Sequence, residues 1–168
     1  TKAVFRLVPY PKHDRLMLVP FSSAELACEA VSAIFRAGIT PSAMEFMERD
    51  AIDYTLKFVE GVQLPIGPEV AAHLLIEVDG NEVPQLMEDC LQIADIVAQF
   101  DAGEILFAES AQEKASLWQL RRKVGEAVKS HSIYKEEDTV VPRAELPKLL
   151  MGVKEIGNRY GFHSVCYG

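Results

Sequence analysis

Arg121 is the residue whose type and setting most directly suggest chemistry. It lies in the run Trp118-Gln-Leu-Arg121, within an expected amphipathic helix. Residues three positions apart share a helix face, so Trp118, which we expect to be buried, places Arg121 near the apolar side. A guanidinium in that position needs a carboxylate, because an unpaired buried charge is costly and the guanidinium fork matches two carboxylate oxygens.

Two kinds of carboxylate would satisfy Arg121. The first is an internal salt bridge, for which the candidate partners are Glu104, Glu126 and Asp138. The second is the carboxylate of a bound ligand. The spacing alone favours the internal salt bridge and leaves the ligand open.

Two charged clusters accompany this helix in the sequence. The segment Lys135-Glu-Glu-Asp138-Thr-Val-Val-Pro142 has a strand-like Thr-Val-Val run, and its acidic residues are typical of a solvated strand end. Alternatively, one of these carboxylates orients Arg121 or Lys135 in a pocket. An earlier charged run, from Glu45 to Asp50, is expected to cap a helix and to form surface pairs.

The remaining reactive side chains form no arrangement that indicates catalysis or metal binding. The four histidines include no close pair and no zinc-like spacing with cysteine, and no Ser/His/Asp or Cys/His pattern marks a nucleophile. We therefore assign no catalytic, cofactor-binding or metal residue within this chain. Three widely separated cysteines predict buried free thiols and a reducing compartment: Cys28, Cys90 and Cys166.

Length and charge limit the classes of function. The 168 residues suffice for one compact domain with a real core. A formal net charge of −8 argues against nucleic-acid binding, because phosphate contacts supply much of that affinity. No apolar run approaches the roughly 20 residues of a membrane span, and the first residues do not resemble a signal peptide.

Hydrophobic periodicity predicts the elements that must position Arg121. Strands are predicted at 1–9, 14–21, 72–79, 104–108, 139–141 and 162–167. Helices are predicted after the capping boxes Ser22-Ser-Ala-Glu25 and Ser110-Ala-Gln-Glu113, and at 50–59, 83–97 and 146–160.

These elements predict an α+β fold with a ferredoxin-like, mainly antiparallel sheet. Each helix carries a single apolar stripe, which suits helices packed on one face of the sheet. A doubly wound nucleotide-binding fold would normally show a glycine-rich turn between strand and helix, and the sequence contains no such motif.

Several short segments together resemble a known family. They are Leu7-Val-Pro, the runs 37–47 and 74–80, Trp118-Gln-Leu-Arg121, Asp138-Thr-Val-Val-Pro142 and Tyr160-Gly161. In this order and spacing, the whole chain resembles the C-terminal domain of FAD-linked oxidases. That group contains the glycolate oxidase D subunit, D-lactate dehydrogenases and D-2-hydroxyglutarate dehydrogenase.

The resemblance implies the cap, or substrate, domain of an enzyme that oxidises 2-hydroxy acids by hydride transfer to FAD. It also implies that Arg121 binds the substrate carboxylate. Members of the D-2-hydroxyglutarate type place a lysine six residues before the Val-Pro proline, where this chain has Glu136, with Lys135 one residue earlier. They also place a threonine one turn after the arginine, where this chain has Gly125. Arg121 and Lys135 are the candidate substrate-binding residues.

The resemblance also carries expectations about the rest of the enzyme. FAD would be bound mainly by an N-terminal domain, and a later histidine-rich motif holds a divalent metal in metal-dependent members. We therefore expect residues 1–168 to be a single-domain fragment, inactive alone. The expected partners are a small 2-hydroxy acid, the FAD domain of the same polypeptide, an electron-acceptor subunit and a second copy in a homodimer. The expected location is the cytoplasm, with peripheral membrane association as a variant.

Two other functions fit the same residues. One is a non-enzymatic, ferredoxin-like module that uses Arg121 to bind a small carboxylate ligand. The other is a subunit-interaction domain.

Overall fold

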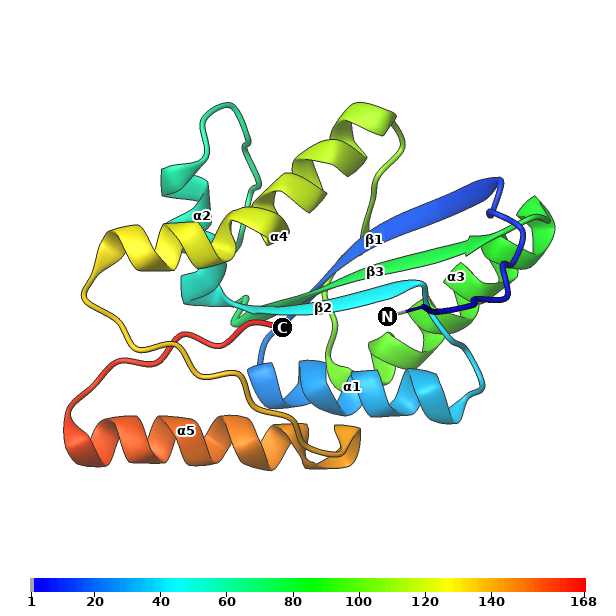
Figure 1. Ribbon diagram of the computed structural model, residues 1–168. Helices are drawn as coiled ribbons and strands as arrows, with labels where there is room; N and C mark the ends of the chain where they lie inside the picture. The colour runs from blue at the N-terminus through cyan, green and yellow to red at the C-terminus, as the bar shows by residue number, and fades with distance from the viewer. Residues whose placement is uncertain (1) are drawn as a thin grey trace.

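A four-stranded sheet lies at the centre of the computed structural model, which describes residues 2–168 (Figure 1). The strand order is β2-β3-β1-β4, and every neighbouring pair is antiparallel. The predicted α+β class with a mainly antiparallel sheet is confirmed. The strands are β1 (His13–Phe21), β2 (Ala43–Glu48), β3 (Ala72–Gly80) and β4 (Leu106–Phe107).

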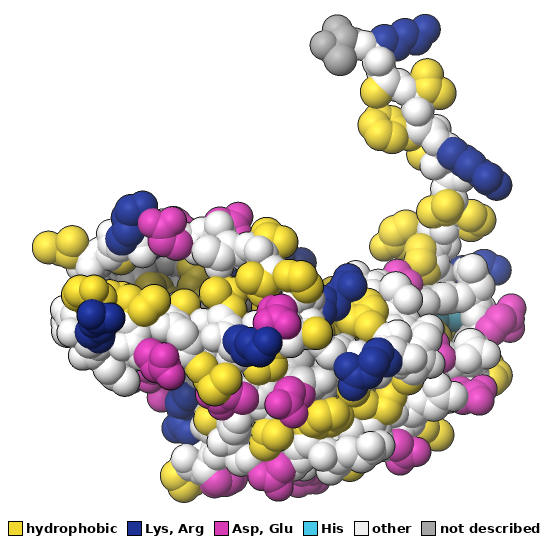
Figure 2. Space-filling view, turned by 90° about the horizontal axis from the view of Figure 1, so that it is seen from below, with side chains coloured by type: hydrophobic (Ala, Val, Ile, Leu, Met, Phe, Trp, Pro, Cys, Tyr) yellow, Lys and Arg dark blue, Asp and Glu magenta, His cyan; other side chains and the backbone are white. Residues whose placement is uncertain are grey.

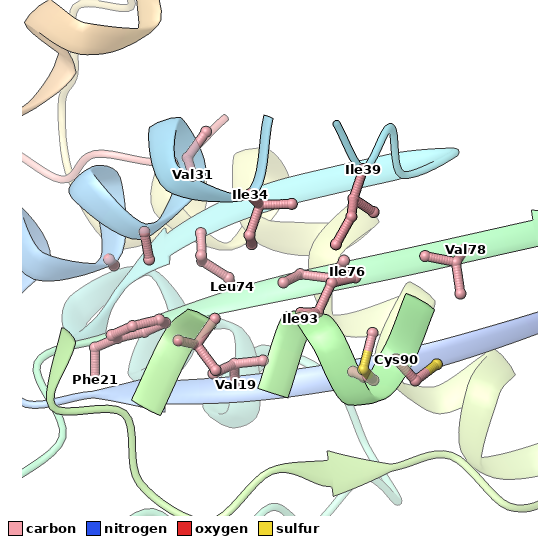
Figure 3. Packing of buried hydrophobic residues seen from close by; sticks show 14 of the residues in the cluster. Val19, Phe21, Val31, Ile34, Ile39, Leu74, Ile76, Val78, Cys90 and Ile93 are labelled. Carbon is pink, nitrogen blue, oxygen red and sulfur yellow. The ribbon is translucent and has the colours of Figure 1, made fainter. Parts of the chain in front are cut away.

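Helices α1 (Ala24–Arg36) and α3 (Val83–Val97) cover one face of the sheet. Figure 3 shows Ile34 from α1 and Ile93 from α3 beside Leu74 of β3, and all three are fully buried. The buried side chains between the sheet and these two helices form the larger part of the core. On β1 and β3, every second side chain points toward this face.

Helices α2 (Arg49–Phe58) and α4 (Ala111–His131) cover the opposite face. Leu16 and Leu75 of the central strands pack there against Leu117 of α4. The prediction of helices on one face only was therefore wrong. The physical reason lies in the central strands, whose apolar runs are nearly continuous and so are buried on both sides.

The C-terminal part of the chain packs around this sandwich. Helix α5 (Leu146–Tyr160) lies against α1 on the outer side, preceded by a short 3-10 helix, η2 (Arg143–Glu145). Helix α5 has the predicted bounds, and Gly161 ends it in a left-handed conformation with φ of 72°. None of the helices within residues 2–168 is long and apolar enough to cross a membrane.

The last residues run beside the edge strand β2. Tyr167 forms an antiparallel bridge with Met47, and the backbone N–H of Glu48 donates to the carbonyl of Cys166 at 3.1 Å. In place of the strand predicted at 162–167, only the last residues of the chain pair with β2. This stretch covers the outer edge of β2.

Two further predicted strands are absent from the described part of the chain. Residues 2–9 form an extended exposed arm, and residues 139–141 form a loop. Thr1, the first residue of the predicted strand 1–9, lies outside the described residues. Figure 2 shows hydrophobic side chains along the arm, which stands away from the body; Phe5, for example, is 80% exposed. Strand-like composition was not enough in either place, since no sheet edge lies alongside to pair with the backbone.

Helix starts follow their capping signals. Ser110 caps α4 in a complete capping box, in which its side chain accepts from the backbone N–H of Glu113 and the Glu113 carboxylate accepts from that of Ser110. At α1 the cap is Ser23, one residue later than the predicted box, and its hydroxyl accepts from the N–H of Leu26 at 3.2 Å. Both helices start within one residue of the predicted position.

Candidate carboxylate-binding site

Arg121 lies in the middle of α4, at the border between the core and solvent. The buried side of α4 consists of Leu117, Leu120, Val124 and Ala127. The Arg121 side chain is 20% exposed, so its guanidinium is largely desolvated and still reachable. A charge in this setting needs an acidic partner, as the sequence predicted.

The partner is Glu45 of β2. Nε and Nη2 of Arg121 lie 2.7 and 2.6 Å from the same oxygen, Oε2 of Glu45. Glu45 stands opposite Leu75 of β3 and therefore shares the sheet face that α4 covers. The internal salt bridge is thus present, but with a partner outside the three candidates.

Those three candidates lie elsewhere or have other partners. Glu126 accepts from Lys123 on its own helix at 2.8 Å. Neither Glu104 nor Asp138 forms an ion pair with Arg121 in the described structure. The prediction that Glu45 caps a helix or forms a surface pair was therefore wrong, because the β2–β3 register turns it toward α4.

Tyr167 forms the second wall of this site. The Arg121 guanidinium lies 5.7 Å from the centroid of its ring, within the range of a cation–π contact. Burial raises the pKa of the Tyr167 phenol, and the nearby Glu136 carboxylate raises it further. The phenol is therefore protonated at neutral pH.

Gly125 faces that phenol. A Cβ atom at Gly125 would lie 3.5 Å from Oη of Tyr167, in ordinary van der Waals contact. The position where D-2-hydroxyglutarate-type relatives were expected to carry a threonine thus faces the tyrosine hydroxyl here. We call the group Glu45, Arg121 and Tyr167 the arginine site.

Lys135, the second predicted ligand residue, does not join the arginine site. Its side chain is 83% exposed and its Nζ lies 2.7 Å from a Glu137 carboxylate oxygen. Glu137 also raises the pKa of Lys135, through a hydrogen bond and its charge. The structure gives Arg121 and Lys135 separate acidic partners, and the role of Lys135 as a substrate ligand stays a prediction.

A second polar group ties α4 to the central strands. The Trp118 indole N–H donates to Oε2 of Glu77 at 3.0 Å, and Lys114 forms ion pairs with Glu77 and Asp14. Burial lowers the pKa of Lys114. With Arg121, these residues form a row along α4 that faces acidic side chains of the sheet. Sequence reasoning missed Lys114, whose position one turn before Trp118 was the available signal.

Metal-ligating and nucleophilic side chains do not gather elsewhere. Residues 2–168 contain no group of three or more His, Cys, Asp or Glu side chains that could hold a metal ion. All three cysteines are free; Cys28 and Cys90 are buried as predicted, whereas Cys166 is partly exposed. Two shallow hollows, of about 250 and 170 Å³, lie beside α1 and between α2 and α4, and Arg121 lines neither.

The structure is thus an α+β domain in which the arginine site joins a guanidinium of α4 to a carboxylate of β2. Residues 10–168 match the sequence profile of the family described as FAD linked oxidases, C-terminal domain. The chain belongs to this family, as the resemblance of its motifs predicted.

Individual relatives agree with this assignment. A D-lactate dehydrogenase from Anaerostipes hadrus is 27% identical over 172 residues, a match that covers 100% of this chain and 36% of that protein. Glycolate oxidase subunit GlcD from Escherichia coli K12 is 32% identical over 161 residues, covering 95% of this chain and 32% of the relative. The chain thus spans about a third of the length of these curated relatives.

A solved structure shares the fold. An alkyldihydroxyacetonephosphate synthase aligns with a TM-score of 0.56 at 14% identity, covering 87% of this chain and 31% of that one. At this level of identity the similarity concerns the fold alone.

Proposed function

We propose that this chain is the substrate-binding domain of an FAD-dependent enzyme that oxidises a 2-hydroxy acid of the glycolate or D-lactate type. The observation that carries the proposal is Arg121, a partly exposed guanidinium on a rigid helix in a domain of the FAD-linked oxidase family. The relatives, a D-lactate dehydrogenase and a glycolate oxidase subunit, support the substrate class.

Arg121 supplies the anchoring part of the reaction. A guanidinium binds a carboxylate through two parallel hydrogen bonds, which fixes the direction of the adjoining C2 carbon. Oxidation of that carbon releases a hydride from C2 and a proton from the 2-hydroxyl, and leaves a 2-oxo acid. FAD, when bound, supplies the hydride acceptor. No residue of this chain is assigned as the base that takes the proton.

Neither of the two hollows is large enough to hold FAD. Both hollows are smaller than the roughly 300–1,000 Å³ of typical ligand pockets, and FAD is larger than most such ligands. We therefore propose that FAD is held mainly by the part of the enzyme that this chain does not span. A metal does not fit the described residues, so no step is assigned to one.

The remaining expectations about partners and location belong to this proposal. An electron-acceptor subunit is consistent with the word subunit in the name of the GlcD relative. We also propose that the enzyme forms a homodimer and lies in the cytoplasm, with peripheral membrane association as a variant.

The test uses the complete gene product with FAD bound. Anaerobic addition of D-lactate or glycolate is expected to bleach the absorbance of the oxidised flavin. Arg121→Met is expected to raise KM roughly 30- to 100-fold, because a charge-assisted carboxylate contact is lost. Arg122→Met is the matched control. It removes the same charge from α4, but the Arg122 guanidinium lies over the Trp118 ring and not at Glu45. Equal effects of the two variants, or no flavin bleaching with any 2-hydroxy acid, would contradict the proposal.

A further inference from the structure

The Arg121–Glu45 pair also bears on which anions the arginine site accepts. Nε and Nη2 of Arg121 converge on one oxygen of Glu45, whereas Nη1 has no hydrogen-bond partner within residues 2–168. A guanidinium has two edges that can each hold a carboxylate. One edge is therefore occupied by Glu45, and the edge formed by Nη1 and Nη2 is left for a ligand.

We propose that Glu45 is a specificity-determining residue, which makes the arginine site accept a 2-hydroxy acid with one carboxylate and discriminate against a 2-hydroxy acid with two. This inference rests on the proposed function, because it takes Arg121 to be the ligand's anchor. Beyond the proposed function, it specifies the number of carboxylates on the substrate and assigns this selectivity to Glu45.

Charge balance supports this discrimination. Four cations on α4 and in the segment after it already have acidic partners, so none of these four is free to meet a second anion, and the Arg122 guanidinium lies over the Trp118 ring. The pairs are Arg121–Glu45, Lys123–Glu126, Lys129–Glu136 and Lys135–Glu137. One ligand carboxylate shares Arg121 with Glu45 and leaves the site with an excess negative charge. A second ligand carboxylate adds to this excess without gaining a cation.

Partial burial of the Arg121–Glu45 pair strengthens this discrimination. The side chains of Arg121 and Glu45 are 20% and 28% exposed. Salt and water screen partly buried charges less than surface charges, so repulsion between Glu45 and a dianionic ligand persists at ordinary ionic strength. The four pairs differ in this respect, since Lys123 and Glu126 are 40% and 57% exposed and are well screened.

The rival role for Glu45 is purely structural, as a tie that holds the Arg121 side chain in place. The two roles make different demands on the side chain. Glu45→Gln keeps the shape and an amide oxygen that accepts from Nε and Nη2, but removes the charge. If Glu45 only holds Arg121 in place, the glutamine variant keeps the wild-type ligand preference. If the charge of Glu45 repels a second ligand carboxylate, the glutamine variant loses that preference.

The experiment compares D-lactate with D-malate, which share the 2-hydroxy acid group and differ by one carboxylate. Binding to this chain is followed by the NMR signal of the Arg121 Nε–H group, assigned with Arg121→Lys. The wild-type chain is expected to bind D-lactate about tenfold more tightly than D-malate. Glu45→Gln is expected to bind both more tightly and to reduce that ratio to about two. Glu126→Gln, which removes the same charge from the exposed Lys123 pair, is expected to keep the wild-type ratio.

The outcomes separate this inference from the proposed function. If D-lactate shifts the Arg121 signal and Glu45→Gln leaves the lactate-to-malate ratio unchanged, the role of Glu45 is wrong and the proposed function stands. If neither acid shifts the signal in the wild type or in Glu45→Gln, Arg121 is not a carboxylate ligand and both fail. Glu45→Ala is expected to narrow the ratio in the same way and replaces the glutamine variant if the latter does not fold.

Discussion

Nζ of Lys154 lies 2.8 Å from Oε2 of Glu48, a buried carboxylate at the end of β2. The same carboxylate oxygen accepts from the backbone N–H of Cys166 at 2.8 Å, and Lys154 also donates to the carbonyl of Ser164 at 2.6 Å. One acidic side chain thus joins α5, the sheet edge and the last residues of the chain. These last residues include Tyr167, so this contact also supports the wall of the arginine site.

Lys154→Met is expected to destabilise the protein by about 1–3 kcal/mol, because it leaves the buried Glu48 charge with only a backbone N–H. Urea unfolding followed by circular dichroism measures the change. Lys148→Met is the control, since Lys148 forms an exposed pair with Glu145, and its effect is expected within about 0.5 kcal/mol. Equal destabilisation by both variants would show that the Glu48 contact is no stronger than a surface pair.

Stability is expected to fall in mild acid because of His73. This side chain is 4% exposed, and its Nδ1 has no hydrogen-bond partner in the described structure. Burial lowers the pKa of His73 to about 4, and the nearby Arg49 charge contributes. The unfolded chain therefore binds more protons than the folded chain between pH 6.5 and 4, and stability is lost as the pH falls through that window. The loss amounts to about 3 kcal/mol.

Urea unfolding at pH 7 and pH 4.5 tests this assignment. His73→Leu is expected to flatten the pH dependence, whatever its effect on stability at pH 7. His13→Leu alters an exposed histidine and is expected to leave the pH dependence in place. If the His73→Leu variant loses as much stability between pH 7 and pH 4.5 as the wild type does, His73 is not the cause of that loss.

Two glycines of α5 are expected to respond oppositely to alanine. A Cβ at Gly157 would lie 2.8 Å from the backbone oxygen of Phe162, too close for any side chain, whereas a Cβ at Gly152 would meet nothing within 4 Å. Gly157→Ala is therefore expected to cost about 1–3 kcal/mol. Gly152→Ala is expected to gain about 0.5–1 kcal/mol from helix propensity. Thermal unfolding of the two variants checks the signs, and a gain at both positions would mean that Gly157 does not approach the Phe162 backbone.

The cysteines are expected to react slowly with iodoacetamide in the folded chain at pH 8. Burial raises the pKa of Cys28 to about 12 and that of Cys166 to about 11, and it also raises the pKa of Cys90. Only the thiolate is nucleophilic, so alkylation requires opening of the structure. Mass spectrometry over time is expected to show Cys166 modified first, because it alone is partly exposed, and all three modified rapidly in urea. Early modification of Cys28 would contradict its burial.

Local sequence signals predicted the helices well, since caps and periodicity act over a few residues. The Ser110 capping box and the Gly161 stop are examples, and both lie where the sequence placed them. Strands depend on distant partners. Residues 139–141 have strand composition but no neighbouring edge, whereas residues 43–48, where no strand was predicted, form β2 because β3 pairs with them.

The arginine site shows the same division. A helix-face argument that needs only Trp118 and Arg121 correctly predicted an arginine in need of a carboxylate. Its partner Glu45 is 76 positions away, and only the β2–β3 register brings the two together. Tyr167 depends on pairing between the last residues and β2, so no local pattern could have indicated it.

The order of strands in the sheet has a consequence for synthesis on the ribosome. β1 emerges before its main partner β3, which follows only after α1, β2 and α2 have been made. Until then the apolar side chains of β1 have neither a neighbouring strand nor the α4 face to cover them. β1 is therefore an exposed, aggregation-prone segment of the nascent chain until β3 has been synthesised. We expect chaperones to bind β1 mainly during this time.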